Sequence, residues 1–299
     1  MKDRLSKLVG FVPVIFVLLW STGFIGAKYA LPYIEPFNLL FIRMMMTVAV
    51  FALLMVVLKI PLPKLHLVKH QAISGLLIHG AYLGGVFAAI KWQMPAGITA
   101  LLVSMQPLLT ALITMAIYKQ RLNKMQWLGL GLGFVGVILV LGSKQQDGDL
   151  VLNWPMMLAA MTALIGITVG SLYQKRFGGG VNLVAASLIQ YIATAILMAI
   201  LTFSFETQIV DWQLPLIASL LWLVFGLSVI AILLLLFMIN EGESAKVAAY
   251  FYLVPGVTAI EAWVLFDETL SLWAIVGVVI SVFGVYLAIK PNKTKPNKS

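Results

Sequence analysis

The chain has 299 residues and a formal net charge of +9, and 62% of its residues are hydrophobic while only 10% are charged. A soluble domain carries roughly 25% charged residues, so this composition excludes an ordinary water-soluble protein. The basic excess does not indicate nucleic acid as a partner, because the Lys and Arg residues lie in short stretches between apolar runs, as the positive-inside rule describes.

Apolar runs of about 18 to 25 residues follow one another along the chain, each long enough to cross a hydrocarbon core of about 30 Å. We interpret the first run, from Leu8 to about Ala27, as a retained helix and not a signal peptide, because a signal core has only about 7 to 15 residues. We expect an all-α polytopic membrane protein with ten transmembrane helices near residues 9–27, 37–58, 70–90, 95–118, 125–142, 155–174, 183–203, 214–239, 244–266 and 272–289.

The basic residues predict the topology of these spans. Most of the 20 Lys and Arg fall in the N-terminal tail, in the second, fourth and sixth loops and at the C-terminal end. Both termini are therefore expected in the cytoplasm. The chain has no cysteine, so disulfide and thiolate chemistry are excluded and the redox compartment stays open.

The chain contains an internal repeat. A shift of 148 positions aligns Ala96–Val140 with Ser244–Ala288 without a gap and pairs Pro107 with Pro255. Each half holds five expected spans, and an odd number forces the second half to enter the membrane upside down. We therefore expect two inverted five-helix repeats, residues 1–146 and 147–290, followed by a basic cytoplasmic tail at 291–299.

The paired prolines are candidate hinges. Inverted repeats are a recurrent build of secondary transporters, in which the two halves exchange conformations around a midplane site. Pro107 and Pro255 lack an amide hydrogen, which frees the carbonyls of Val103 and Phe251 for a ligand, water or a side chain. The alternative is that both prolines only kink packed helices.

The last helix of each half carries small residues at a spacing suited to close approach. Gly129 and Gly133 in the first half match Gly277 and Ser281 in the second. This small-xxx-small spacing predicts packing between the two closing helices and not ligand binding.

Three stretches of the first half carry a family resemblance: LLWSTGFIGAKYAL, FNLLFIRMMMTVAVFALL and GITALLVSMQPLLTALITMAIYKQRLNKMQWLGLGLGFVGVILVL. They closely resemble the repeat of the EamA family in the drug/metabolite transporter superfamily, and the second half resembles its second copy. The resemblance implies a ten-helix exporter of amino acids or other small metabolites in the bacterial inner membrane. The sequence departs from the family after the fourth span, where a usual Gly-Glu pair reads Lys119 and Gln120.

Glu261 is a carboxylate in the middle of an expected span, where an acid costs about 3 kcal/mol on insertion scales. We interpret it as a proton-coupling or substrate site, with a structural hydrogen bond and a helix end closer to water as the alternatives. His79, with Tyr82 three residues on, is a second proton-coupling candidate, because histidine titrates near neutral pH; a satisfied core histidine is the alternative.

Arg43 on the second span is placed where the resemblance expects a basic residue. It could bind a substrate carboxylate through two parallel hydrogen bonds, or it could hold backbone carbonyls. Further polar and aromatic groups within spans could form a pocket with His79 and Tyr82, although each could equally be a packing residue: Trp20, Ser21, Gln106, Tyr173, Gln174, Gln190, Tyr250 and Tyr252.

The function that these features predict is secondary transport by alternating access, with export of amino acids or similar metabolites and with proton coupling or uniport both open. A flippase or carrier of a lipid-linked, drug-like or nucleotide-type solute is the alternative. An intramembrane enzyme would need a motif such as H-E-x-x-H or G-x-S-x-G, and neither is present. The expected partners are a small solute and the lipid bilayer, with no cofactor or metal; a monomer suffices and a dimer is not excluded.

Overall fold

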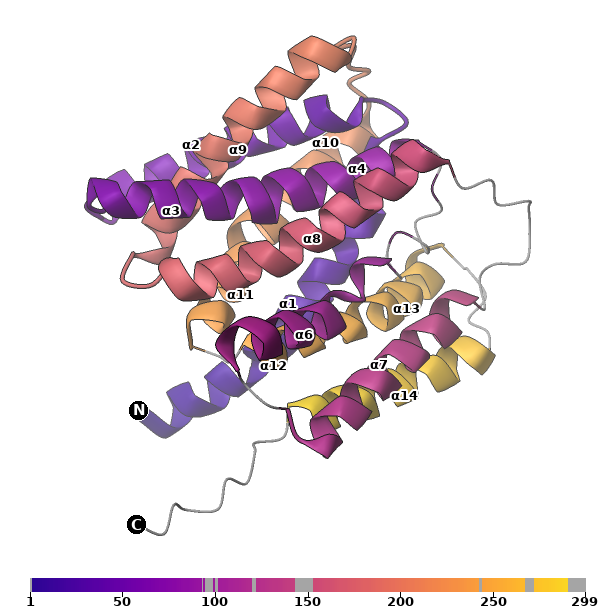
Figure 1. Ribbon diagram of the computed structural model, residues 1–299. Coiled ribbons are helices and arrows are strands. Elements are labelled where there is room, and N and C mark those ends of the chain that lie inside the picture. Colours follow the sequence, from indigo (N-terminus) through magenta and orange to yellow (C-terminus); the bar gives the residue numbers. More distant parts are fainter. Residues whose placement is uncertain are drawn as a thin grey trace.

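The structure, a computed structural model, describes residues 2–92, 94, 99, 102–119, 122–142, 153–241, 244–266 and 272–289. These residues form a helical bundle (Figure 1). The helices of the first half are α1 (Lys2–Ala30), α2 (Pro36–Val57), α3 (Leu65–Gly75), the π-helix η1 (Leu76–Ala81), α4 (Tyr82–Lys91), α6 (Gln106–Tyr118) and α7 (Lys124–Gly142).

The second half repeats this order. Its helices are α8 (Trp154–Phe177), α9 (Leu183–Phe205), α10 (Leu214–Trp222), the π-helix η2 (Leu223–Ala231), α11 (Ile232–Glu241), α12 (Ser244–Ala249), the 3₁₀-helix η3 (Tyr250–Leu253), α13 (Val254–Phe266) and α14 (Leu272–Ala288).

The expected spans are present as apolar helices. Within the described ranges, five helical segments are long and apolar enough to cross a membrane, and five shorter apolar helices accompany them. Each of these corresponds to one expected span, so the prediction of an all-helical, ten-helix membrane fold is confirmed. The expected tail at 291–299 lies outside the described residues.

The two ends of the bundle differ in charge. We call the end with the α1–α2 and α9–α10 connections the acidic end, because it carries Glu35, Glu206 and Asp211. We call the opposite end, with the α2–α3 and α8–α9 connections, the basic end, because it carries Lys59, Lys64, Lys175 and Arg176.

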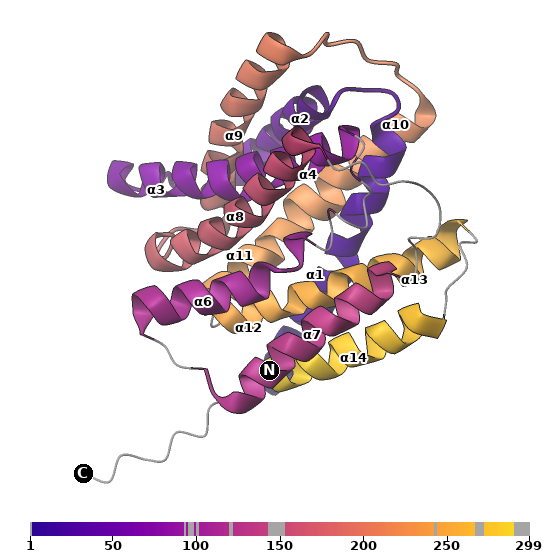
Figure 2. The same cartoon turned by 45° about the vertical axis from the view of Figure 1, so that its right-hand side comes forward.

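The halves pack through two pairs of equivalent helices, α7 with α14 and α2 with α9, and through the contact of α4 with α8 (Figures 1 and 2). These three contacts are the most extensive between the described helices. Helix α1 packs against α10 and α13, whereas α6, the counterpart of α13, packs against α8, the counterpart of α1. This exchange of partners is the contact pattern of two inverted repeats.

Both halves interrupt their third and fourth spans at equivalent points. The third spans contain the π-helices η1 and η2. The expected span 95–118 has a turn at Ser104 and Met105 before α6, and the expected span 244–266 changes to the 3₁₀-helix η3 before α13. Pro107 and Pro255 therefore stand in the first turn of α6 and α13, where a missing amide hydrogen costs no helical hydrogen bond.

The closing helices α7 and α14 touch through their backbones, as their small residues predict. A Cβ atom added at Gly129 would lie 2.5 Å from the backbone nitrogen of Ala288, and one added at Gly284 would lie 2.4 Å from that of Gly133. The expected packing between the closing helices is confirmed, because only glycine permits this approach.

Gly129→Ala is expected to destabilise the protein by about 1–3 kcal/mol, because its methyl group meets the backbone of α14. Gly131→Ala is the matched control, two residues along the same helix, with no atom within 4 Å of the added Cβ. Thermal unfolding in detergent compares the two. Equal melting temperatures of the two variants would show that the contact between α7 and α14 accommodates the methyl group without loss of stability.

The acidic end is held by two glutamates of different halves. The Glu206 carboxylate accepts hydrogen bonds from the backbone N–H groups of Phe37 (2.7 Å) and Asn38 (2.6 Å), which caps the start of α2. Glu35 accepts from the backbone N–H and the hydroxyl of Thr207, both at 2.7 Å. These bonds tie the α1–α2 connection to the α9–α10 connection.

Candidate functional site

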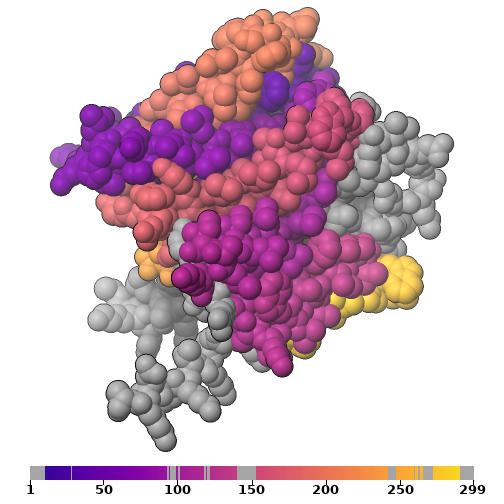
Figure 3. Space-filling view, in the orientation of Figure 1, coloured from indigo at the N-terminus to yellow at the C-terminus, as the bar shows by residue number. Residues whose placement is uncertain are grey.

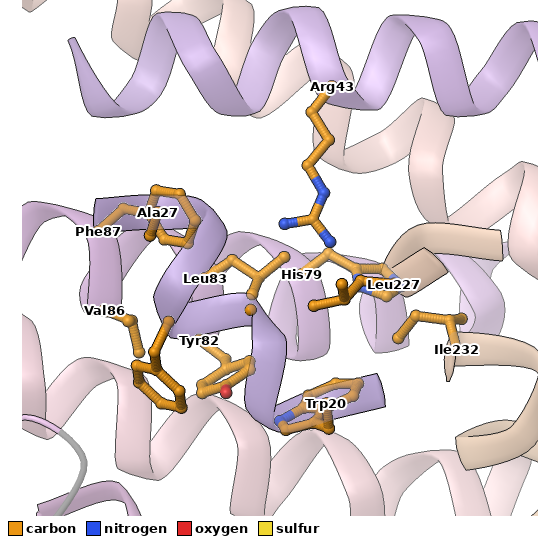
Figure 4. Close-up of a pocket in the computed structure, with 12 residues that line it drawn as sticks. Trp20, Ala27, Arg43, His79, Tyr82, Leu83, Val86, Phe87, Leu227 and Ile232 are labelled. Carbon is orange, nitrogen blue, oxygen red and sulfur yellow. The ribbon is translucent and has the colours of Figure 1, made fainter. Parts of the chain in front are cut away.

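A narrow cavity lies between α1, α2, the η1–α4 segment and the η2–α11 segment. It extends from the middle of these helices toward the acidic end, since its α1 residues run from Trp20 to Ala27 and its α4 residues run from Tyr82 to Phe87. Figure 4 shows the lining residues: Trp20, Gly23, Phe24, Ala27, Arg43, His79, Tyr82, Leu83, Val86, Phe87, Leu227 and Ile232.

Arg43 brings a buried positive charge to this cavity. Its side chain is 3% exposed and points from α2 toward His79 and Leu227 (Figure 4). The Nε–H donates to the hydroxyl of Ser228 at 2.8 Å. No carboxylate stands among the described residues that line the cavity, so the guanidinium is available to an anionic group of a solute.

His79 lies beside Arg43 within the π-helix η1. Its ring stacks on Tyr191, with 4.4 Å between ring centroids, and the Tyr191 hydroxyl donates to the Ser228 carbonyl at 3.0 Å. Gln190 approaches the His79 ring without a hydrogen bond of normal geometry, and neither ring nitrogen has a partner among the described residues. His79 of η1 and Ser228 of η2 are thus connected through Tyr191.

Aromatic side chains form the floor of the cavity. Trp20 stacks on Tyr82 with ring centroids 6.0 Å apart, and Phe251 meets Trp20 edge to face at 5.6 Å. Phe16 completes the group, 5.0 Å from Trp20. A guanidinium opposite an aromatic wall suits a solute with a carboxylate and an apolar or cationic part.

A smaller cavity shares Trp20, Phe24 and Tyr82 with the first. Val103, Phe251 and Pro255 all line it. The prediction that Pro255 frees the Phe251 carbonyl is wrong, because the 3₁₀-helix η3 precedes α13 and this carbonyl accepts a hydrogen bond from the backbone N–H of Val254. The helix interruptions of the two halves therefore face the same space. This placement is consistent with hinges, which stay a prediction.

Glu261 lies apart from the main cavity, at the contact of α13 with α1. Its Oε1 accepts a hydrogen bond from the Ser21 hydroxyl at 2.6 Å, and the Thr258 hydroxyl donates to the Ser21 carbonyl at 3.3 Å. The other carboxylate oxygen, Oε2, is buried and has no partner among the described residues. Ser21 follows Trp20, so the acid is linked to the aromatic floor through one peptide bond.

The structure brings together Trp20, Arg43, His79 and Tyr82 of the predicted binding residues and leaves the others outside the cavity. Gln106 is buried at the start of α6, and Tyr250 is half-buried in η3. Tyr173 accompanies His70 at the basic end, with its hydroxyl 2.7 Å from Nδ1. Tyr252 is buried against Gly133 between the closing helices, which fits a packing role.

Sequence reasoning did not single out Tyr191 or Ser228. A signal for Tyr191 exists, because the repeat shift of 148 residues pairs it with Arg43. Ser228 carries no comparable signal, since serine is common in packed transmembrane helices. Across the described ranges, His, Asp and Glu nowhere gather in the groups of three that could hold a metal ion.

The apolar helices, the inverted pairing of the halves and the cavity between them are features of a membrane transporter. The EamA-like transporter family matches residues 9–142 and again residues 154–290. The chain belongs to the EamA-like transporter family and contains two copies of its domain.

Named relatives and a solved structure resemble most of the chain. A probable amino-acid metabolite efflux pump of Salmonella typhimurium is 24% identical over 95% of this chain and 96% of its own length. The inner membrane transporter YedA of Escherichia coli strain K12 is 28% identical over 76% of this chain and 72% of its own. A crystal structure with 22% identity superposes with a TM-score of 0.78 over 94% of this chain and 97% of that one, which shows the same fold.

The backbone conformation at Lys119 bears on the departure from the family sequence at this position. Lys119 ends α6 with φ of 52°, in the left-handed region that glycine enters without steric cost. The glycine usual at this position is therefore explained by the backbone, and Lys119 accepts the strain. Gln120, the second departure, lies outside the described residues.

Proposed function

We propose that this transporter exports amino acids or similar small metabolites across the bacterial inner membrane by alternating access. The observation that carries the proposal is Arg43, a buried cation that faces an aromatic-lined cavity with no carboxylate among the described lining residues. Such a site matches a solute with one carboxylate and a modest apolar side chain. The relative from Salmonella typhimurium, a probable amino-acid metabolite efflux pump, supports the same class.

The orientation follows from the charges at the two ends. Under the positive-inside rule, the basic end faces the cytoplasm, and both termini lie there with it. The cavity then belongs to the outer half of the membrane. The name of the relative YedA, an inner membrane transporter, supports the location.

A carrier of lipid-linked or nucleotide-type solutes is the second candidate. Such a solute bears several phosphate charges and calls for several cations around it. Among the described lining residues, Arg43 is the one permanent cation, and His79 is the other residue able to carry positive charge. The charge balance therefore favours a single carboxylate.

Proton coupling is the finer part of the proposal. Glu261 is an acid within α13 that holds one hydrogen bond and one unpartnered oxygen, and it joins α13 to α1 beside the floor of the cavity. A proton on Oε2 would change that contact at the point where the two halves meet. His79 is the second candidate, because it lines the cavity itself.

Efflux from liposomes tests the solute class. Purified protein reconstituted with a pool of labelled amino acids is expected to release some of them selectively, and an inward or outward pH gradient is expected to change the rate if transport is proton-coupled. Liposomes with the Arg43→Gln variant are the control for leakage. Retention of every amino acid by folded protein would shift the solute class to drug-like or lipid-linked compounds.

A further inference from the structure

A second group of buried polar residues lies in the basic half of the bundle, away from the cavity. The glutamine cluster consists of six residues from α3, α8 and α9: Gln71, Ser74, Ser171, Gln174, Ser187 and Gln190. Each is at most 8% exposed. Figure 3 shows α3, α8 and α9 side by side on one face of the molecule.

One amide group joins the three helices. The Nε2 group of Gln190 donates to Oε1 of Gln71 at 2.9 Å and to Oε1 of Gln174 at 3.2 Å. The Nε2 group of Gln71 donates to the carbonyl of Gly178 at 3.1 Å, which fixes the end of α8. The cluster therefore closes the basic half of the bundle through hydrogen bonds between neutral side chains.

The cluster leaves much of its hydrogen-bonding capacity unused. Five of its polar atoms are buried without a partner among the described residues, namely Oγ of Ser74, Ser171 and Ser187, Nε2 of Gln174 and Oε1 of Gln190. Each such group costs about 1–3 kcal/mol relative to a solvated or paired one. Serines are common where transmembrane helices pack closely, but packing in this conformation does not explain two buried glutamines with unused amide groups.

The inverted repeat gives an independent reason to place one member of the cluster, Ser171, on a path. In the acidic half, Trp20, Gly23 and Ala27 of α1 line the cavity. The repeat shift of 148 residues places Thr168, Ser171 and Lys175 of α8 at the equivalent positions. When the halves exchange conformations, this face of α8 lines the cavity of the opposite half. Ser171 is thus identified both by its unpartnered hydroxyl and by the repeat.

The cluster also reaches the central site. Gln190 approaches the His79 ring, and its neighbour in sequence, Tyr191, stacks on that ring. The Thr194 hydroxyl, one turn further along α9, donates to the carbonyl of Gly75 in α3 at 3.0 Å. Polar groups therefore continue from the basic end to the residues beside Arg43.

We propose that the glutamine cluster is the closed basic half of the solute path, which opens along α8 and α9 when Gln190 releases Gln71 and Gln174. Its hydroxyl and amide groups then bind water and the polar groups of the passing solute. None of the six residues is charged, and Lys175 at the basic end is a cation that the repeat places on the same face of α8 as Ser171. This inference rests on the alternating access of the proposed function.

Single cysteines test the path, because the natural chain has none. Ser171→Cys and Ser187→Cys are near-isosteric changes, and a charged, membrane-impermeant thiol reagent reports whether water reaches them. We expect both to react in inside-out vesicles and to stay unreactive in spheroplasts. Ser281→Cys is the matched control: Ser281 is 2% exposed at the contact of α7 and α14, and its cysteine variant is expected to stay unreactive from both sides.

Adding Gln190→Leu to Ser187→Cys removes both amide bridges and is expected to increase the labelling rate about tenfold, since two hydrogen bonds no longer oppose opening. No labelling of Ser171→Cys or Ser187→Cys in folded protein, or labelling only in spheroplasts, would overturn the proposed path. The labelling of Ser171→Cys and Ser187→Cys alone decides for or against the path, so the result does not depend on whether Gln190→Leu folds.

The same experiment separates the path from the solute class. Labelling is measured first without solute and then with amino acids at saturating concentration. If both cysteines are labelled but amino acids do not change the labelling, the proposed path is supported and amino acids are excluded as its solute. If the protein exports amino acids but neither cysteine is labelled, the solute class is supported and the proposed path is excluded.

Discussion

Arg43→Gln is expected to remove the preference of the transporter for a carboxylate. Wild-type protein should bind an amino acid more tightly than the corresponding amino-acid amide, because the amide lacks the negative charge that the guanidinium recognises. Hydrogen bonds to charged groups contribute about 1.5–3 kcal/mol, so we expect a loss of about 10- to 100-fold in affinity for the amino acid and little change for the amide. Ligand-dependent thermal stabilisation of the purified protein measures both.

Two variants control for indirect effects at this site. Ser228→Ala removes the partner of the Arg43 Nε–H and keeps the charge, so a moderate loss with preserved preference for the carboxylate is expected. Arg43→Lys keeps the charge without the planar fork and should retain part of the preference. If Arg43→Gln still discriminates the amino acid from its amide, then Arg43 does not bind the carboxylate.

The sequence predicted the elements of this fold because membrane spans depend on local composition. The ten apolar runs, the odd number of spans in each half and the glycines of α7 and α14 are all read within short windows. Trp20, Arg43, His79 and Tyr82 could be selected as candidates for a related reason, since polar and aromatic residues are conspicuous in a span. Their convergence on one cavity required the tertiary structure.

The faces of the third spans could not be predicted from regular helical spacing. Both contain π-helical segments, and one inserted residue turns every following side chain by about 100° around the axis. His79 lies in η1 and Ser228 in η2, so the direction of each depends on where the extra residue falls. The position of Tyr252 could not be predicted for another reason. Its ring packs against Gly133, and this contact joins residues far apart in the chain.

Glu261 lies outside the central cavity, so coupling between proton and solute would have to act through the helices that join the two sites. The Glu261 carboxylate accepts a hydrogen bond from the Ser21 hydroxyl, while the neighbouring Trp20 forms part of the floor of the cavity. A solute that moves Trp20 would therefore shift Ser21 against α13, and a proton on Glu261 would shift the same contact from the other side. The acid need not touch the solute to respond to it, because both act on α1.

Glu261→Gln is expected to abolish solute-driven proton movement while solute exchange between the two sides continues. The glutamine side chain keeps an oxygen that can accept the Ser21 hydroxyl, so the α1–α13 contact is retained, but it cannot bind and release a proton. A pH-sensitive dye inside proteoliposomes measures proton movement after solute is added, and labelled-solute exchange is measured in parallel.

Ser21→Ala distinguishes the titrating role of Glu261 from its structural role. This variant removes the hydrogen bond and leaves the carboxyl group, so it should slow exchange and proton movement together and preserve their ratio. Loss of both activities in Glu261→Gln would point to the α1–α13 contact and require the folded state to be checked, since a changed buried network can disturb packing. Undiminished proton movement in Glu261→Gln would exclude this acid as the coupling site and leave His79, the titratable residue that lines the cavity, as the group to test next.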